Sequence, residues 1–292
     1  MCKVAVVTTG FFDGVHLGHR HVLETVVSLA RERGEEAVVV TFWPHPRTVL
    51  QQDARDFRIL STLEEKKRLL ADAGIDRVEI LPFTREFAAL KADGYLQLLA
   101  DRYGASLVVM GYDNRIGSDR RSAEEMRDLP IIRIVGEYHP DESISSTRIR
   151  NLLIQGNVER ANAMLGYPYS LHGAVVAGNR MGRTIGFPTA NMQLYEPLKL
   201  VPGNGVYAVE AEVLGRSYIG MCNIGTRPTV GGTVRTIETH ILDFDEEIYG
   251  LPMTVRFRER IRDERKFPSL DALREQLLVD NSKIIAIFAK KS

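Results

Sequence analysis

The chain has 292 residues, 44% hydrophobic and 26% charged, which is enough for two domains that each bury a core. Lysine plus arginine equals aspartate plus glutamate, at 38 each, so no net basic field favours nucleic acid or an anionic membrane. The two cysteines, Cys2 and Cys222, form neither a disulfide framework nor a metal site. We therefore expect a cytoplasmic protein without a signal peptide or membrane span.

The N-terminal stretch predicts a strand, a turn and a helix. Val4–Val7 is short, apolar and β-branched, as in a buried strand, and apolar residues recur at helical spacing over Val22–Ala30 before Gly34 ends the pattern. The amides that begin such a helix attract phosphate. His16 and His19 are three residues apart, so both can face one side of the first helical turn.

The turn itself has the sequence G-F-F-D-G-V-H-L-G-H, from Gly10 to His19. It resembles the opening motif of the bacterial bifunctional riboflavin kinase/FMN adenylyltransferases, and its H-x-G-H part is the signature of the nucleotidyltransferase superfamily. The resemblance implies a Rossmann-like α/β domain with a parallel sheet, in which His16 and His19 stabilise charge on a phosphorus centre. The other residues it assigns to ATP are Gly10, Phe11, Asp13 and Gly18.

The rest of the first half alternates predicted strands and helices, which favours a parallel sheet. Further strands are expected at 37–42, 78–81, 107–110 and 131–135. A capping box at Ser61–Glu64 predicts a helix that ends near Ala73, and Thr84–Arg102 is expected to form one long amphipathic segment.

A second glycine turn, Gly111–Gly117, follows the predicted strand at 107–110. It resembles the second motif of the family, which usually has an aromatic residue and Arg-Phe-Gly where this chain has Asn114 and Ile116. The resemblance assigns Gly111, Asp113 and Arg115 to ATP. A polar loop that merely closes a strand is the alternative.

The segment Ser145–Arg150 opens the next predicted helix, which runs to about Gln155. Serine and threonine are natural N-caps, but hydroxyl and basic side chains beside exposed amides also favour phosphate. The family motif I-S-S-T-x-I-R matches here. It implies that Ser146, Thr147 and Arg148 hold the triphosphate and the departing pyrophosphate.

The pattern changes after a short predicted helix at 157–165. From Ser170 onward, short alternating segments stand between Gly, Pro and Asn, which predicts an all-β region, most simply a small barrel, with a terminal helix capped by Ser269. Leu270, Leu273 and Leu277 are expected on one face of that helix. We place the domains at 1–164 and 165–292.

The second half contains its own glycine-rich segment, Gly178–Asn191. Glycines let backbone amides cradle phosphates, although the segment lacks the ending of a Walker A loop. G-x-x-x-G-R-x-x-G-F-P-T-A-N resembles the riboflavin kinase signature. The residues it assigns to ATP or flavin are Gly178, Gly182, Arg183, Gly186, Pro188, Thr189 and Asn191, with Thr189 and Asn191 as ligands of Mg²⁺.

Three further strings match the kinase half of the family. N-I-G-T-R-P-T, from Asn223, is expected to form a turn. Glu238 lies in a predicted strand at 236–244; a lone Glu there is usually solvent-facing, but the Glu of E-x-H is the family's proposed general base, and His240 shares its face. In I-R-D-E-R-K-F, from Ile261 to Phe267, the resemblance implies that Arg265 contacts the flavin. The alternative is that this string is a run of charged residues exposed to solvent.

The resemblance covers essentially the whole chain. It implies phosphorylation of riboflavin to FMN, then adenylylation of FMN to FAD, with ATP and Mg²⁺ and with no nucleic acid or membrane partner, by a monomer or weak homo-oligomer. One alternative is a kinase whose adenylyltransferase half is degenerate, which Asn114 and Ile116 favour. Another is a flavin- or nucleotide-binding regulator without turnover.

Overall fold

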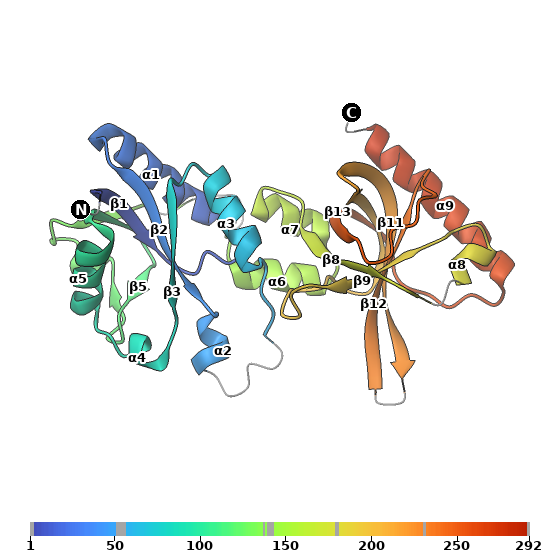
Figure 1. Cartoon of the computed structure of the whole chain (residues 1–292), viewed down its shortest axis with the longest axis horizontal. Helices are drawn as coiled ribbons and strands as arrows, with labels where there is room; N and C mark the ends of the chain where they lie inside the picture. The colour runs from blue at the N-terminus through green and yellow to red at the C-terminus, as the bar shows by residue number, and fades with distance from the viewer. Residues whose placement is uncertain are drawn as a thin grey trace. The chain divides into compact units, whose positions relative to one another are not determined.

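The computed structural model describes residues 3–50, 57–136, 138, 143–178, 181–229 and 232–290. They form two compact units, Met1–Ser146 and Thr147–Ser292 (Figure 1). The division comes earlier in the chain than the predicted domain boundary between residues 164 and 165, which stays a prediction. Within the described residues, no helix combines the length and apolar character needed to cross a membrane.

The first unit is built around one sheet of five parallel strands in the order β3-β2-β1-β4-β7. The strands are β1 (Ala5–Thr9), β2 (Glu36–Trp43), β3 (Arg77–Pro82), β4 (Ala105–Gly111) and β7 (Ile132–Val135). Because β1 lies between β2 and β4, the strand order reverses at β1. The turns after β1 and β4 therefore open at the same edge, at the switch point where open α/β sheets bind ligands. The predicted α/β class is confirmed.

Helices cover both faces of this sheet, as a parallel sheet requires. They are α1 (Leu17–Arg33), α2 (Pro46–Leu50), α3 (Leu63–Asp72), α4 (Arg85–Ala88) and α5 (Ala92–Tyr103), with a 3-10 helix, η2 (Glu124–Met126), and a small hairpin of β5 (Arg115–Ile116) and β6 (Arg121–Ser122). α1 ends as predicted, with Gly34 in the left-handed region at φ +68°.

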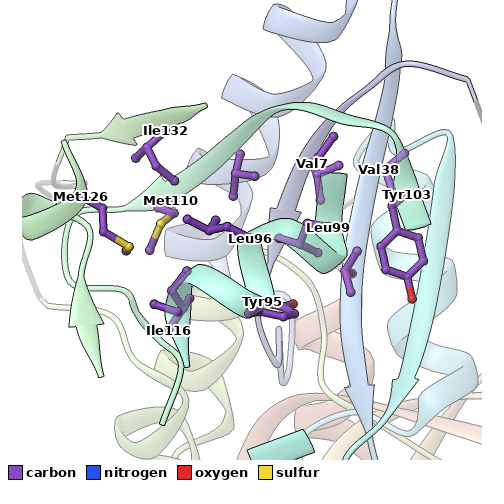
Figure 2. Packing of buried hydrophobic residues seen from close by; sticks show 14 of the residues in the cluster. Val7, Val38, Tyr95, Leu96, Leu99, Tyr103, Met110, Ile116, Met126 and Ile132 are labelled. Carbon is purple, nitrogen blue, oxygen red and sulfur yellow. The ribbon is translucent and has the colours of Figure 1, made fainter. Parts of the chain in front are cut away.

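Neighbouring residues of each strand point into different apolar layers. Figure 2 shows one layer, in which strand residues meet α5 at Val7, Val38, Met110, Tyr95, Leu96 and Leu99. The layer on the other face joins the strands to α1 at Val6, Val39, Val109, Leu23 and Val26. Burial on both sides explains why these strands are continuous apolar runs rather than alternating ones.

Two local predictions in this unit are wrong. Thr84–Arg102 forms two helices, because the Leu90 carbonyl accepts from the Ser118 amide and the Ala92 amide donates to Asp119 Oδ1, at 2.8 and 2.9 Å. The capping box lies one residue later than expected: Thr62 caps α3, and Glu65 returns the bond to the Thr62 amide. Ser61 instead forms hydrogen bonds with Asp13 and Gly14 of the first glycine turn.

The second unit is a closed barrel of antiparallel strands in the order β10-β11-β12-β9-β8-β13, with β13 also paired to β10. Its strands are β8 (Ser170–Val176), β9 (Ala190–Leu194), β10 (Gly205–Val213), β11 (Arg216–Thr229), β12 (Gly232–Ile241) and β13 (Pro252–Arg262). Its helices are α6 (Ser146–Ile154), α7 (Val158–Leu165), α8 (Met181–Thr184) and α9 (Leu270–Ala289). The predicted barrel with a terminal helix is confirmed.

Three details of this unit differ from the sequence prediction. The string from Asn223 is not a turn but the second half of β11. Gly205–Val213 alternates in the sequence, as a half-buried strand does, but Gly205–Val209 is buried throughout, with Val206 and Ala208 packed against Ile284 of α9. Leu270 is exposed at the start of α9, while Leu277 packs against the barrel and Ser269 caps the helix as expected.

Candidate active sites

The backbone of the first glycine turn passes through the left-handed region at three residues. Gly14 lies in the left-handed region at φ +81°, and Phe12 and Val15 also have positive φ. A β-carbon at Gly18 would crowd the His16 ring at 3.3 Å. His16 caps α1 by accepting a hydrogen bond from the His19 amide through Nδ1, at 3.3 Å, so a neutral His16 holds its proton on Nε2.

The two histidines of the turn lie face to face. Their ring centroids are 3.6 Å apart and the planes are 14° from parallel. Burial lowers the pKa of His19 well below its usual range, and His16 and Lys66 lower it further. Nδ1 of His19 is buried without a hydrogen-bond partner among the described residues. A neutral imidazole of this kind can donate to a phosphate oxygen throughout the neutral pH range.

Asp13 performs a structural task that sequence reasoning missed. Its buried carboxylate accepts from the amides of Leu60 and Ser61 and from the Ser61 hydroxyl, at 3.0 to 3.3 Å. The Gly14 amide in turn donates to Ser61 Oγ at 3.0 Å. These hydrogen bonds hold the turn against the segment before α3. The predicted contact between the Asp13 side chain and ATP stays a prediction.

Lys66 of α3 is a second residue that the sequence did not single out. It is 3% exposed, and its Nζ lies 3.5 Å from Thr41 Oγ1, whose hydroxyl donates to the Phe11 carbonyl. Burial lowers the pKa of the Lys66 ammonium to about 8, against the opposing influence of Asp13. The Lys66 ammonium is thus buried close to the first glycine turn, a position that depends on the packing of α3.

We expect the stability of the first unit to depend on pH through Lys66. The pKa of an unfolded lysine is about 10.4, so between pH 8 and 10 the unfolded chain keeps a proton that the folded chain has released. Wild-type stability should therefore rise with pH across this window, by about 2 kcal/mol relative to Lys66→Met. Urea unfolding at pH 7 and pH 10, followed by fluorescence of the single tryptophan, Trp43 in β2, measures this difference.

The matched control for that measurement is Lys67→Met. Lys67 is the exposed neighbour on the same helix and pairs with Glu64 at 2.9 Å. Its replacement should leave the pH dependence unchanged. An equal stability difference between wild type and Lys66→Met at both pH values would contradict the assignment.

The second glycine turn is joined to the first through Asn114. Its Nδ2 donates to the Thr9 carbonyl at the end of β1, at 3.3 Å, and Ile116 is buried in the layer beneath α5. The two residues that depart from the family pattern therefore fit the fold rather than disrupt it. Gly111 lies at the end of β4, and Asp113 and Arg115 are exposed beyond it. Their contact with ATP stays a prediction.

The third motif reaches the first turn through Ser146. Ser146 Oγ donates to the Asp13 carbonyl at 3.0 Å. Thr147 and Arg148 continue α6 in the second compact unit, so their predicted grip on the triphosphate stays a prediction.

In the second unit the glycine-rich segment folds back on itself. The Gly182 carbonyl accepts from the amides of Ile185 and Phe187, at 3.2 and 2.8 Å, and Phe187 is buried against the barrel. Gly178 lies so close to the Asn191 amide group that a β-carbon would not fit. Asn179 and Arg180 lie outside the described residues. The glycines thus bring the loop against the start of β9.

Glu238 stands in β12 opposite two asparagines. Strand register pairs it with Asn191 of β9 on one side and with Asn223 of β11 on the other. Directly paired residues share a face of the sheet, with β-carbons roughly 5 Å apart. Ile237 and Thr239 point into the barrel, so Glu238 and His240 share the opposite face, as expected. The His240 ring nitrogen Nδ1 lies 2.8 Å from the Pro188 carbonyl.

The chemistry of these side chains suits a magnesium-bound triphosphate. Thr189 and Asn191 would supply neutral oxygen ligands, and Mg²⁺ commonly takes few protein ligands and completes its shell with phosphates and water. The described residues contain no group of three or more His, Cys, Asp or Glu that could hold a metal by itself. Burial raises the pKa of the Cys222 thiol to about 12, which rules out a thiolate nucleophile there.

The fold and the two sites define a protein with a nucleotidyltransferase-type α/β domain and a riboflavin kinase-type barrel. The family model for FAD synthetase matches residues 2–148, and that for riboflavin kinase matches residues 165–288. The chain belongs to the bifunctional riboflavin kinase/FMN adenylyltransferase family.

Individual relatives agree with this assignment. The enzyme of that name from Bacillus subtilis (strain 168) is 36% identical, over 98% of this chain and 93% of the relative. The one from Escherichia coli (strain K12) is 39% identical, over 94% and 90%. A crystal structure from Streptococcus pneumoniae, described as a macrolide-efflux protein, matches with a TM-score of 0.91 and 35% identity, over 96% of this chain and 93% of that one.

Proposed function

We propose that the chain converts riboflavin to FMN in its second unit and FMN to FAD in its first. The observation that carries this proposal is the match to both family models and to bifunctional relatives along nearly the whole chain. This favours two activities over a kinase with a degenerate first half. The fit of Asn114 and Ile116 into the first unit supports the same choice.

In the proposed kinase reaction, the ribityl hydroxyl of riboflavin attacks the γ-phosphorus of ATP and ADP leaves. Glu238 takes the proton of the attacking hydroxyl, and Asn191 and Thr189 would hold the Mg²⁺ that accompanies the triphosphate. The metal would neutralise charge on the phosphates. Positioning and charge neutralisation are most of what phosphoryl transfer requires. The register of Glu238 with Asn191 supports these roles.

In the proposed adenylyl transfer, an FMN phosphate oxygen attacks the α-phosphorus of ATP. The bond to the β-phosphate breaks and pyrophosphate leaves, so no covalent enzyme intermediate is needed. His16 and His19 donate hydrogen bonds to the charge that develops on phosphorus. The stacked rings and the neutral state of His19 support this role.

The test is to incubate the purified chain with riboflavin, ATP and Mg²⁺ and to separate FMN from FAD by chromatography. We expect FMN first and FAD afterwards. FMN without FAD, even at high enzyme concentration, would leave only the kinase. Binding without either product would leave the regulator that does not turn over. Omitting Mg²⁺ tests whether the two reactions require the metal.

The cytoplasmic location and the monomeric or weakly oligomeric state of the protein stay predictions.

We expect the kinase activity to survive in a fragment comprising Thr147–Ser292. α6 and α7 are tied to the barrel, since the Gly203 amide donates to the Leu153 carbonyl and Asn162 Nδ2 donates to the Phe257 carbonyl, at 2.8 and 2.9 Å. The measurement is FMN formation by this fragment. Fragments that begin at Asn157 and at residue 165 are the comparison, and they should lose stability in that order. A folded but inactive Thr147–Ser292 fragment would show that the kinase needs the first unit.

A further inference from the structure

The C-terminal helix α9 contains a completely buried acid, Asp280. Its two carboxylate oxygens accept from Arg262 Nε and from Gln276 Nε2, both at 2.7 Å. A buried ion pair is weak evidence for stability, since removing charges from water costs about as much as the pairing returns. Its two directed bonds instead give Asp280 the means to hold other side chains in a defined geometry.

The groups held by Asp280 belong to one short segment, which begins at Arg262, the last residue of β13, and continues to Phe267. Arg262 is bound directly, and Arg265 donates to the Oε1 of the same Gln276 that donates to Asp280. Both guanidinium groups lie over the Phe267 ring, at 5.5 and 4.7 Å from its centroid. One buried carboxylate therefore orients two arginines, one directly and one through a glutamine.

The same segment reaches β11, the neighbour of the strand β12 that contains Glu238. The Glu264 carboxylate lies against Gly225, and Asn204 Nδ2 donates to Glu264 at 3.3 Å. Gly225 is two residues along β11 from Asn223, the register partner of Glu238. Residues 262–267 are thus connected to the candidate kinase site from one side and to α9 from the other.

The apolar face of α9 contacts the other part of that site. Ile284 and Leu277 pack in one cluster with Ile185 and Phe187 of the glycine-rich segment. Because Gln276, Asp280 and Ile284 recur at four-residue spacing, the polar and apolar contacts come from the same side of the helix. α9 is placed to fix both segments at once.

We infer that Asp280 is a positioning residue for flavin binding, which holds Arg262 and, through Gln276, Arg265 toward the ring of riboflavin. Guanidinium groups offer several hydrogen-bond donors in a fixed plane, and the oxygen and nitrogen acceptors of a flavin ring lie in a plane as well. The inference rests on the proposed kinase function of the second unit.

The test compares Asp280→Asn, Gln276→Met and the exposed control Asp271→Asn in the full chain. We expect Asp280→Asn to raise the KM for riboflavin about tenfold while kcat and the KM for ATP stay within about twofold, as a misplaced binding group does. Gln276→Met, which loses the link to Arg265 alone, should raise the KM for riboflavin less. Asp271→Asn should behave as wild type, and all three should make FAD from supplied FMN normally.

A purely structural role would instead lower kcat in proportion to the loss of folded protein and leave both KM values unchanged, and that result overturns the inference. If Asp280→Asn does not fold, the Gln276→Met variant is used as the test instead. An unchanged KM for riboflavin in Gln276→Met would then overturn the inference. A wild-type chain that makes no FMN overturns the proposed function instead. In that case, quenching of riboflavin fluorescence would still measure the affinity of each variant for riboflavin. Equal affinities in wild type and all variants would overturn the positioning role of Asp280.

Discussion

Glu238→Gln is expected to reduce FMN formation by at least about a hundredfold, the usual contribution of a general base. Glutamine has the shape of glutamate but cannot take the proton of the ribityl hydroxyl. The strand register with Asn191 and Asn223 should stay intact, so the KM for ATP should change little. The measurement is the initial rate of FMN formation from riboflavin and ATP.

The control for this variant is in the same chain. FAD formation from supplied FMN should stay at the wild-type rate, which also shows that the protein is folded. Glu247→Gln, a change at an exposed carboxylate in the loop after β12, should leave both activities intact. A Glu238→Gln enzyme with near-normal kinase turnover would remove Glu238 from the role of base.

His19→Ala should stop FAD formation and let FMN accumulate. Loss of one donor to a developing oxyanion costs on the order of a hundredfold to a thousandfold in rate. His19 lies against His16, and its pKa is lowered by burial, so the ring removed is a neutral donor. The measurement is the rate of FAD formation from FMN and ATP at saturating substrate.

His21→Ala is the matched control, because His21 lies on the same helix outside the motif. It should keep FAD formation, and FMN formation by the second unit should be normal in both variants. FAD formation at the wild-type rate in His19→Ala would mean that His19 does not carry the transfer.

Much of the fold followed from local patterns. The apolar strands of the first unit, the glycine that ends α1 and the serine that caps α9 are determined by residues a few positions apart. Such signals also placed Glu238 and His240 on one face of a strand, since side chains alternate. They failed for Thr84–Arg102, where hydrogen bonds with Ser118 and Asp119 divide a helix that looks continuous in the sequence.

The motifs, too, could be found in the sequence, because each is a continuous string whose spacing is preserved. What no string contains is the set of partners supplied by distant segments. Asp13 is bound by residues 60–61, and Asn114 reaches the end of β1. Asp280 binds an arginine eighteen positions earlier.

Those contacts were decided by the tertiary structure alone. The parallel sheet brings the turns after β1 and β4 to one edge, and the closed barrel brings Asn191, Glu238 and Asn223 into register. A buried lysine such as Lys66 looks in the sequence like any charged residue on the outer face of a helix. Its lowered pKa and its place close to the first glycine turn arise only when α3 packs and water is removed around it.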